Sequence, residues 1–167
     1  MGAAFAALTM SVDALLPLLA YCFVAAVGIT LAAVDVAVHR LPNRLTVLLA
    51  IGTTTLFAIH AAAADDSRQL LESVASGAGM ALSYVLMSSL TGGGIGLGDA
   101  KLALGLGIAA GWLGWRSTLV AGMLGLLLTG LAAVALLLLG RAGRGDSIPH
   151  GPFMVLATLG TVVLMHA

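Results

Sequence analysis

The run "LLPLLAYCFVAAVGITLAAV", residues 15–34, decides the fold class of this chain. A helix needs roughly 20 mainly apolar residues to cross the hydrocarbon core of a bilayer, and this run supplies that length without a charged side chain. The whole chain is also strongly apolar, with 60% hydrophobic residues, 8% charged residues and a mean hydropathy of +1.13. Soluble domains carry about a quarter charged residues. The sequence therefore predicts an integral membrane protein.

Further apolar runs extend this prediction to an all-α protein with about six transmembrane helices in one bundle. The segments expected to be helical are 14–34, 45–64, 70–90, 100–114, 117–139 and 151–166, of which the fourth and sixth are short for a span. Small residues such as Gly77, Gly107 and Gly111 recur in them at the spacing that lets membrane helices pack closely. The connections are short and contain no Ser/Pro-rich linker, so we expect residues 1–167 to form a single domain.

The basic residues predict the orientation in the membrane. Five of the seven lie in the first, third and fifth connections, namely Arg40, Arg44, Lys101, Arg141 and Arg144. Because cytoplasmic loops carry an excess of Lys and Arg, we expect these connections inside and both termini outside. Two acidic residues then fall at the cytoplasmic boundary: Asp35, at the end of the first segment, and Asp99, at the start of the fourth.

These two aspartates are the candidate catalytic residues. A carboxylate in a membrane segment costs a few kcal/mol and usually faces water or the bundle interior. If Asp35 and Asp99 meet, repulsion and desolvation favour one shared proton. The ionised member can then activate water while the neutral member assists a carbonyl, which is peptide hydrolysis without a metal or a covalent intermediate. The loop "GGGIGLGDAKL", residues 92–102, either admits a substrate backbone or is simply a turn between two helices.

Three blocks of sequence resemble the type IV prepilin peptidase family. Residues 96–99, "GLGD", match the Gly-x-Gly-Asp signature of membrane aspartyl peptidases and continue into Lys101-Leu102. Asp35 with the following "LPNRLT", residues 41–46, is similar to the other aspartate motif of the family, and "IPHGPF", residues 148–153, is similar to its late "IPxGPF" segment. By this resemblance Asp35 and Asp99 are the catalytic pair. The residues implied to bind substrate or shape the loops are Gly96, Gly98, Lys101, Pro42, Asn43, Pro149, Gly151 and Pro152.

The resemblance also implies a function and a location. The expected activity is cleavage of the leader peptide from a prepilin-like protein substrate at the cytoplasmic face. The expected location is the cytoplasmic (inner) membrane of a bacterium or an archaeon, with membrane lipid around the protein. Many bacterial members carry an extra region with paired cysteine motifs that accompanies N-methylation. This chain has one cysteine, Cys22, so we expect a short stand-alone peptidase without methyltransferase activity, similar to the form associated with tight-adherence-type pili.

Composition and spacing argue against several other partners. The formal net charge of zero does not favour binding to nucleic acid. No His, Cys and carboxylate cluster shows the spacing of metal ligands, so we expect neither a metal nor a cofactor. The oligomeric state and the particular pilin stay open.

Two alternative functions fit some of the same features. A small proton- or cation-coupled transporter would also use intramembrane aspartates and broken Gly-rich helices, although both aspartates are expected at one face rather than at the midplane. An inactive pilus-assembly factor would keep the fold without the chemistry. His150 occupies a position that is often aromatic in the family, and its role is left open.

Overall fold

The computed structural model describes residues 1–12, 15–90, 96–141 and 148–166 of the chain. In these ranges the secondary structure consists of helices, which confirms the all-α prediction. The helices are α1 (Gly2–Ser11), α2 (Leu15–Val38), α3 (Asn43–Ala64), α4 (Ser67–Leu90), α5 (Leu97–Gly111), α6 (Trp115–Leu138) and α7 (Gly151–His166).

The expected count of about six spans is only roughly matched. Four helices, α2, α3, α4 and α6, are long and apolar enough to cross a membrane, which makes this a multi-pass membrane protein. Helices α5 and α7 have 15 and 16 residues. At 1.5 Å per residue they extend over about 22–24 Å, less than the roughly 30 Å hydrocarbon core. Helix α1 was not expected, and α2 continues past the predicted end of the first segment, so Asp35 lies within it.

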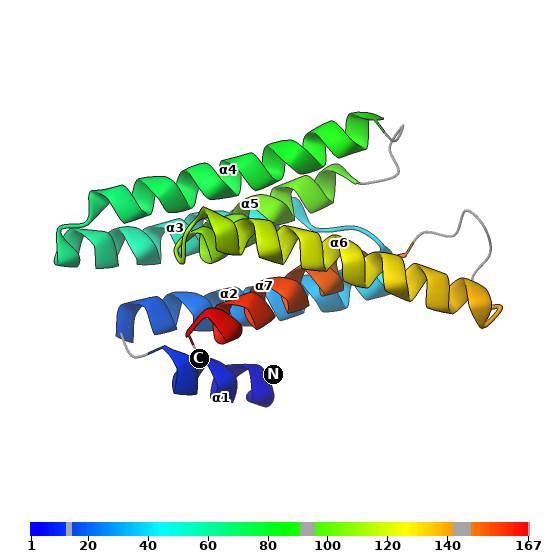
Figure 1. Ribbon diagram of the computed structural model, residues 1–167, viewed down its shortest axis with the longest axis horizontal. Coiled ribbons are helices and arrows are strands. Elements are labelled where there is room, and N and C mark those ends of the chain that lie inside the picture. Colours follow the sequence, from blue (N-terminus) through cyan, green and yellow to red (C-terminus); the bar gives the residue numbers. More distant parts are fainter. Residues whose placement is uncertain (13–14, 91–95, 142–147, 167) are drawn as a thin grey trace.

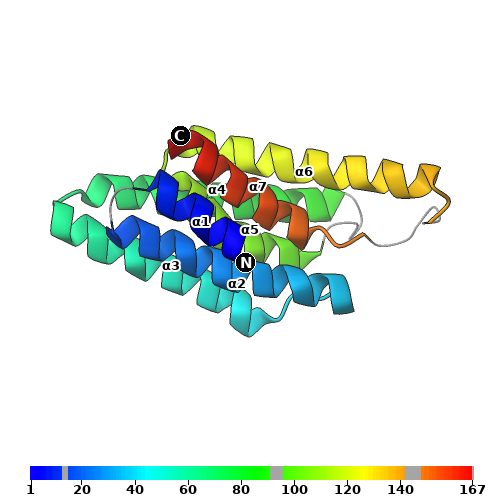
Figure 2. The ribbon, with the colours of Figure 1, turned by 90° about the horizontal axis from the view of Figure 1, so that it is seen from below.

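Helix α5 occupies the centre of the bundle. All residues from Leu102 to Gly111 except Leu104 are buried, and α5 contacts α2, α3, α4, α6 and α7 (Figure 1). Helices α2 and α7 pack together on one side, with α1 alongside them, and α6 extends beyond its neighbours (Figure 2). The C-terminal end of α2 and the N-terminal ends of α5 and α7 lie at the same end of the bundle, on the right in Figure 1. Chain segments far apart in the sequence therefore meet there.

Close packing of α4 against α5 depends on glycine, as the sequence predicts. A Cβ atom added to Gly107 would lie 2.8 Å from the Cα atom of Gly77, and one added to Gly77 would lie 2.7 Å from the Leu104 carbonyl oxygen. Gly111 meets Ser76 in the same way, at 2.6 Å. Any larger residue would push these helices apart, so the glycines hold α5 in the centre of the bundle.

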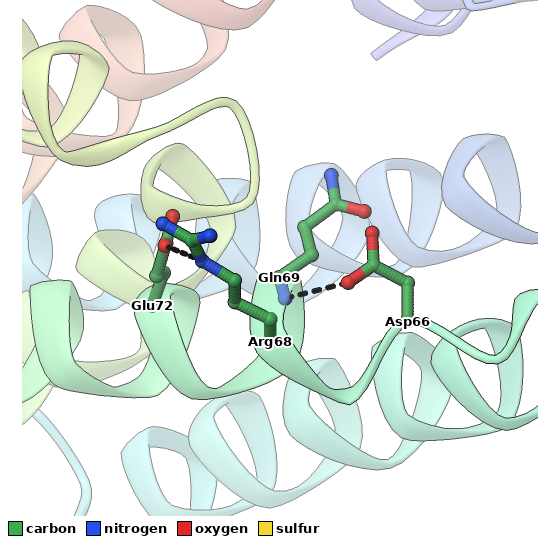
Figure 3. Close-up of polar contacts among 4 residues, drawn as sticks. All are labelled: Asp66, Arg68, Gln69 and Glu72. Atoms are coloured by element: carbon green, nitrogen blue, oxygen red, sulfur yellow. Dashed lines mark hydrogen bonds and ion pairs between the residues drawn. The ribbon is translucent and has the colours of Figure 1, made fainter.

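The opposite end of the bundle carries the polar turn between α3 and α4 (Figure 3). The Asp66 carboxylate accepts a hydrogen bond of 3.0 Å from the backbone N–H of Gln69, and Arg68 pairs with Glu72 at 2.8 Å across one turn of α4. The Gln69 side chain donates to the Trp112 carbonyl at 2.9 Å and so joins this turn to the end of α5. The Asp66 carboxylate and the Gln69 amide satisfy backbone groups at helix ends, and this turn lies at the end of the bundle away from the start of α5.

Candidate active site

Asp35 is a buried acid near the C-terminal end of α2. Its side chain is 6% exposed, and its Oδ2 atom accepts a hydrogen bond of 2.9 Å from the backbone N–H of Gly151. The two residues are 116 positions apart in the chain. Gly151 is the first residue of α7, so the partial positive charge of a helix N-terminus faces the carboxylate.

Glycine is needed at position 151 because the start of α7 and the end of α2 approach so closely. A Cβ atom at this position would lie 2.9 Å from Asp35 Oδ2 and 3.3 Å from Asp35 Cγ. Either contact is closer than real Cβ atoms normally allow. Pro152 follows in the first turn of α7, where a missing N–H leaves no intrahelical hydrogen bond unmade. The sequence Gly151-Pro152 thus starts a helix with its first N–H directed at Asp35.

Asp99 lies in the first turn of α5, which is outside the four long spans. Its Oδ2 atom accepts a hydrogen bond of 3.2 Å from the Gly96 N–H. Burial and, to a smaller extent, the negative charge of Asp35 raise the pKa of Asp99 to about 6, and the hydrogen bond from Gly96 opposes this increase. A Cβ atom added to the neighbouring Gly98 would lie 3.3 Å from the Leu41 Cβ atom, so this glycine permits close approach of the segment that follows α2.

Both aspartates line one cavity of about 550 Å³. Its walls come from four parts of the chain: the end of α2 with the residues up to 43, the start of α5, residues 126–130 of α6, and residues 148–150 before α7. The lining includes Arg40 and His39 as well as Gly96, Gly98 and Pro149. Two acids in the wall of one cavity, where the charge of Asp35 raises the pKa of Asp99, can share one proton and act as base and acid toward a bound molecule.

The other predicted residues lie at the starts of α3 and α5. Pro42 is the residue before α3 and makes no side-chain cap. Asn43, also in the cavity wall, is the first residue of α3, and its Oδ1 atom accepts a hydrogen bond of 2.8 Å from Lys101 Nζ. This contact ties the starts of α3 and α5 together. Gly92, Gly93 and Gly94, which the sequence also singled out, lie outside the described residues.

His150 is the site residue whose partners sequence reasoning did not find. Its Nε2 atom lies 2.9 Å from the hydroxyl of Tyr84 in α4, and its Nδ1 atom lies 2.6 Å from the hydroxyl of Thr129 in α6. These two contacts join the residue before α7 to α4 and to α6, which are far apart in the chain. A tyrosine and a threonine inside apolar helices are a weak signal by themselves, because nothing in the local sequence indicates that their side chains meet one histidine.

Within the ranges that the structure describes, no group of three His, Cys, Asp or Glu side chains is placed to hold a metal ion. The polar side chains of the cavity wall include the carboxylates of Asp35 and Asp99 and the imidazoles of His39 and His150.

Comparison with known proteins identifies the family. A model of the type IV leader peptidase family, Peptidase_A24, matches residues 22–140, which include both Asp35 and Asp99 but not the 148–153 segment. Neither the comparison with curated proteins nor that with solved structures found a match. Since the family match extends over more than half of the sequence, this chain belongs to the type IV leader peptidase family and is a membrane-embedded peptidase.

Proposed function

We propose that the chain is an aspartic endopeptidase that removes the leader peptide from prepilin-like proteins, with Asp35 and Asp99 as its catalytic pair. The observation that carries the proposal is the shared cavity: two acids from α2 and α5 line it in a chain of the leader peptidase family. The other predicted residues at this end of the bundle then have supporting roles, because they start helices or allow the close approach of backbone segments.

The two aspartates have different surroundings, and these suggest different roles. Asp35 receives a backbone N–H and faces the N-terminus of α7, which complements a negative charge. We therefore assign it as the base that takes a proton from water. Asp99 has a raised pKa and is the acid that protonates or hydrogen-bonds the scissile carbonyl. A substrate that displaces water from the cavity would raise the pKa of Asp99 further and keep it protonated.

The proposed substrate has a short basic leader followed by a hydrophobic helix. That helix would stay in the bilayer beside the apolar outer faces of the bundle, while the leader junction enters the cavity at its end. We also propose that this end faces the cytoplasm and that the membrane is the inner membrane of a bacterium or an archaeon, because the connections at this end carry most of the basic residues.

The test is cleavage of a prepilin-like substrate by purified protein in detergent. Asp35→Asn and Asp99→Asn keep the shape of each side chain and remove its ability to ionise, so each should abolish cleavage. The double variant should be no worse than either single variant, because residues that act as a unit are not additive.

Asp66→Asn is the matched control for these variants. It makes the same chemical change at the opposite end of the bundle, and its Oδ1 atom can still accept the Gln69 hydrogen bond. This variant should retain full activity. Substantial turnover by either Asp35→Asn or Asp99→Asn would refute the catalytic pair and revive the transporter or the assembly factor, which ion flux into vesicles would then distinguish.

A further inference from the structure

His150 is held at both ring nitrogens by side chains from two helices. Tyr84 Oη lies 2.9 Å from Nε2, and Thr129 Oγ1 lies 2.6 Å from Nδ1. Tyr84 is 2% exposed, and its ring also lies against the imidazole, with the two centroids 5.5 Å apart. The imidazole is thus fixed in position and in orientation between α4 and α6.

The hydroxyl of Thr129 determines which nitrogen of His150 carries the proton. A hydroxyl has one proton to donate, and Thr129 donates its proton to the Gly125 carbonyl at 2.9 Å. Its oxygen must therefore accept a hydrogen bond from His150, so Nδ1 is protonated. In the neutral ring Nε2 then accepts a hydrogen bond from the Tyr84 hydroxyl. The three residues form one directed chain from Tyr84 through His150 and Thr129 to the backbone of α6.

The surroundings of His150 favour this neutral form. Burial lowers the pKa of its imidazole, and the charge of Asp35 partly opposes that effect. Asp35 from α2 and Tyr84 from α4 act on it directly, and Asp99 of α5, His39 and Arg40 lie in the wall of the same cavity.

The peptide unit that follows His150 is the one that reaches Asp35. The His150 carbonyl accepts hydrogen bonds from Phe153 and Met154 at 3.1 and 3.2 Å, which begin α7. The N–H of the same peptide unit, contributed by Gly151, donates to Asp35 Oδ2. Any rotation of this peptide plane would break the contacts on both sides, so the position of His150 decides where the Gly151 N–H points.

We propose that His150, clamped between Tyr84 and Thr129, is the positioning residue that holds the Gly151 N–H on Asp35. It does not touch the reacting atoms, and it acts by keeping a donor on the catalytic base. This inference rests on the proposed function only where its effect is read in catalysis, since the clamp itself can be observed without substrate.

The test compares Thr129→Val, which removes the hydroxyl and keeps the shape, with Thr129→Ser, which keeps the hydroxyl. Thr129→Val should lower kcat by about five- to tenfold, the effect of one hydrogen bond, with KM unchanged. Thr129→Ser should restore activity to within about twofold of wild type. Thr54→Val is the matched control, because the Thr54 hydroxyl makes the same bond to a carbonyl four residues earlier but has no histidine partner among the residues that the structure describes.

Two further measurements do not depend on cleavage. Nitrogen-15 spectra of labelled histidine should show the Nδ1–H tautomer at His150 in wild type and in Thr129→Ser, and a mixture of tautomers in Thr129→Val. Hydrogen exchange at the Gly151 amide should become about five- to tenfold faster in Thr129→Val and stay unchanged in Thr54→Val.

The outcomes separate the two proposals. If wild type fails to cleave, the proposed function fails, while the tautomer and the exchange rate still decide whether the clamp exists. An Nε2–H tautomer in wild type, or a Gly151 amide that exchanges equally fast in Thr129→Val and Thr54→Val, would overturn the positioning role. Equal kcat in these two variants of an active enzyme would overturn it as well.

Discussion

The contact between Gly151 and Asp35 can be tested by adding a single methyl group. In Gly151→Ala the new Cβ atom would lie 2.9 Å from Asp35 Oδ2, whereas ordinary contacts begin at 3.4 Å. The difference, 3.4 − 2.9 = 0.5 Å, must be taken up by α7 or by the end of α2. If that movement is directed along the hydrogen bond, the distance from the Gly151 nitrogen to Asp35 Oδ2 grows from 2.9 to about 3.4 Å, beyond the usual range of 2.7–3.2 Å.

The expected effect follows from the loss of this bond. Hydrogen bonds to charged groups contribute about 1.5–3 kcal/mol, which corresponds to a decrease of about 10- to 150-fold in kcat/KM if the bond serves the catalytic base. Leaving a buried carboxylate without its donor should also lower the free energy of unfolding by a comparable amount. The assay is cleavage of a prepilin-like substrate by purified protein, combined with thermal unfolding in the same detergent.

Gly160→Ala is the control on the same helix. A Cβ atom at Gly160 would meet nothing within 4 Å, so this variant should keep wild-type activity and gain up to about 1 kcal/mol of stability from the higher helix propensity of alanine. If Gly151→Ala cleaves as fast as Gly160→Ala, the Gly151 N–H has no part in catalysis and the assignment of Asp35 as the supported base is wrong.

Three further predictions concern pH, local strain and orientation. Because the folded-state pKa of Asp99 is raised to about 6, kcat/KM should fall as the pH rises through that value and the acid loses its proton. The free energy of unfolding of wild type should also fall as the pH rises from about 4 to about 6, because only the folded state still holds the proton there, and Asp99→Asn should not show this decrease. Asp65 follows α3 with φ 54°, in the left-handed backbone region, which is higher in energy for a residue with a Cβ atom than for glycine. Asp65→Gly should therefore raise the free energy of unfolding by up to about 1 kcal/mol, and a decrease would contradict this prediction. A cysteine placed at Asp65 should react with a membrane-impermeant reagent added from outside, and labelling from the cytoplasmic side alone would reverse the proposed orientation.

The sequence by itself determined the helical segments and the family. Runs of about 20 apolar residues leave a helix as the structure that satisfies every backbone group in lipid, and α3, α4 and α6 begin and end within three residues of the predicted segments. The three sequence blocks that contain Asp35, Asp99 and residues 148–153 together indicated the family, which the family match confirms. Short glycine spacings likewise predicted close helix packing, which the structure confirms between α4 and α5.

The two short helices near the site were also predicted from the sequence. Helix α7 begins and ends where segment 151–166 was expected, and α5 has the length of segment 100–114 but is shifted by three residues. Helix α1 was missed because residues 2–11 form a run too short for a span.

Only the tertiary structure decided which side chains meet in the cavity. The hydrogen bond from Gly151 to Asp35 joins residues 116 positions apart, and the partners of His150 come from α4 and α6. A helix in lipid is apolar on nearly all sides, so its sequence has no amphipathic face to indicate how it is rotated about its axis. That rotation is set by the packing of small residues between neighbouring helices, and it is the rotation that turns Tyr84 and Thr129 toward one imidazole.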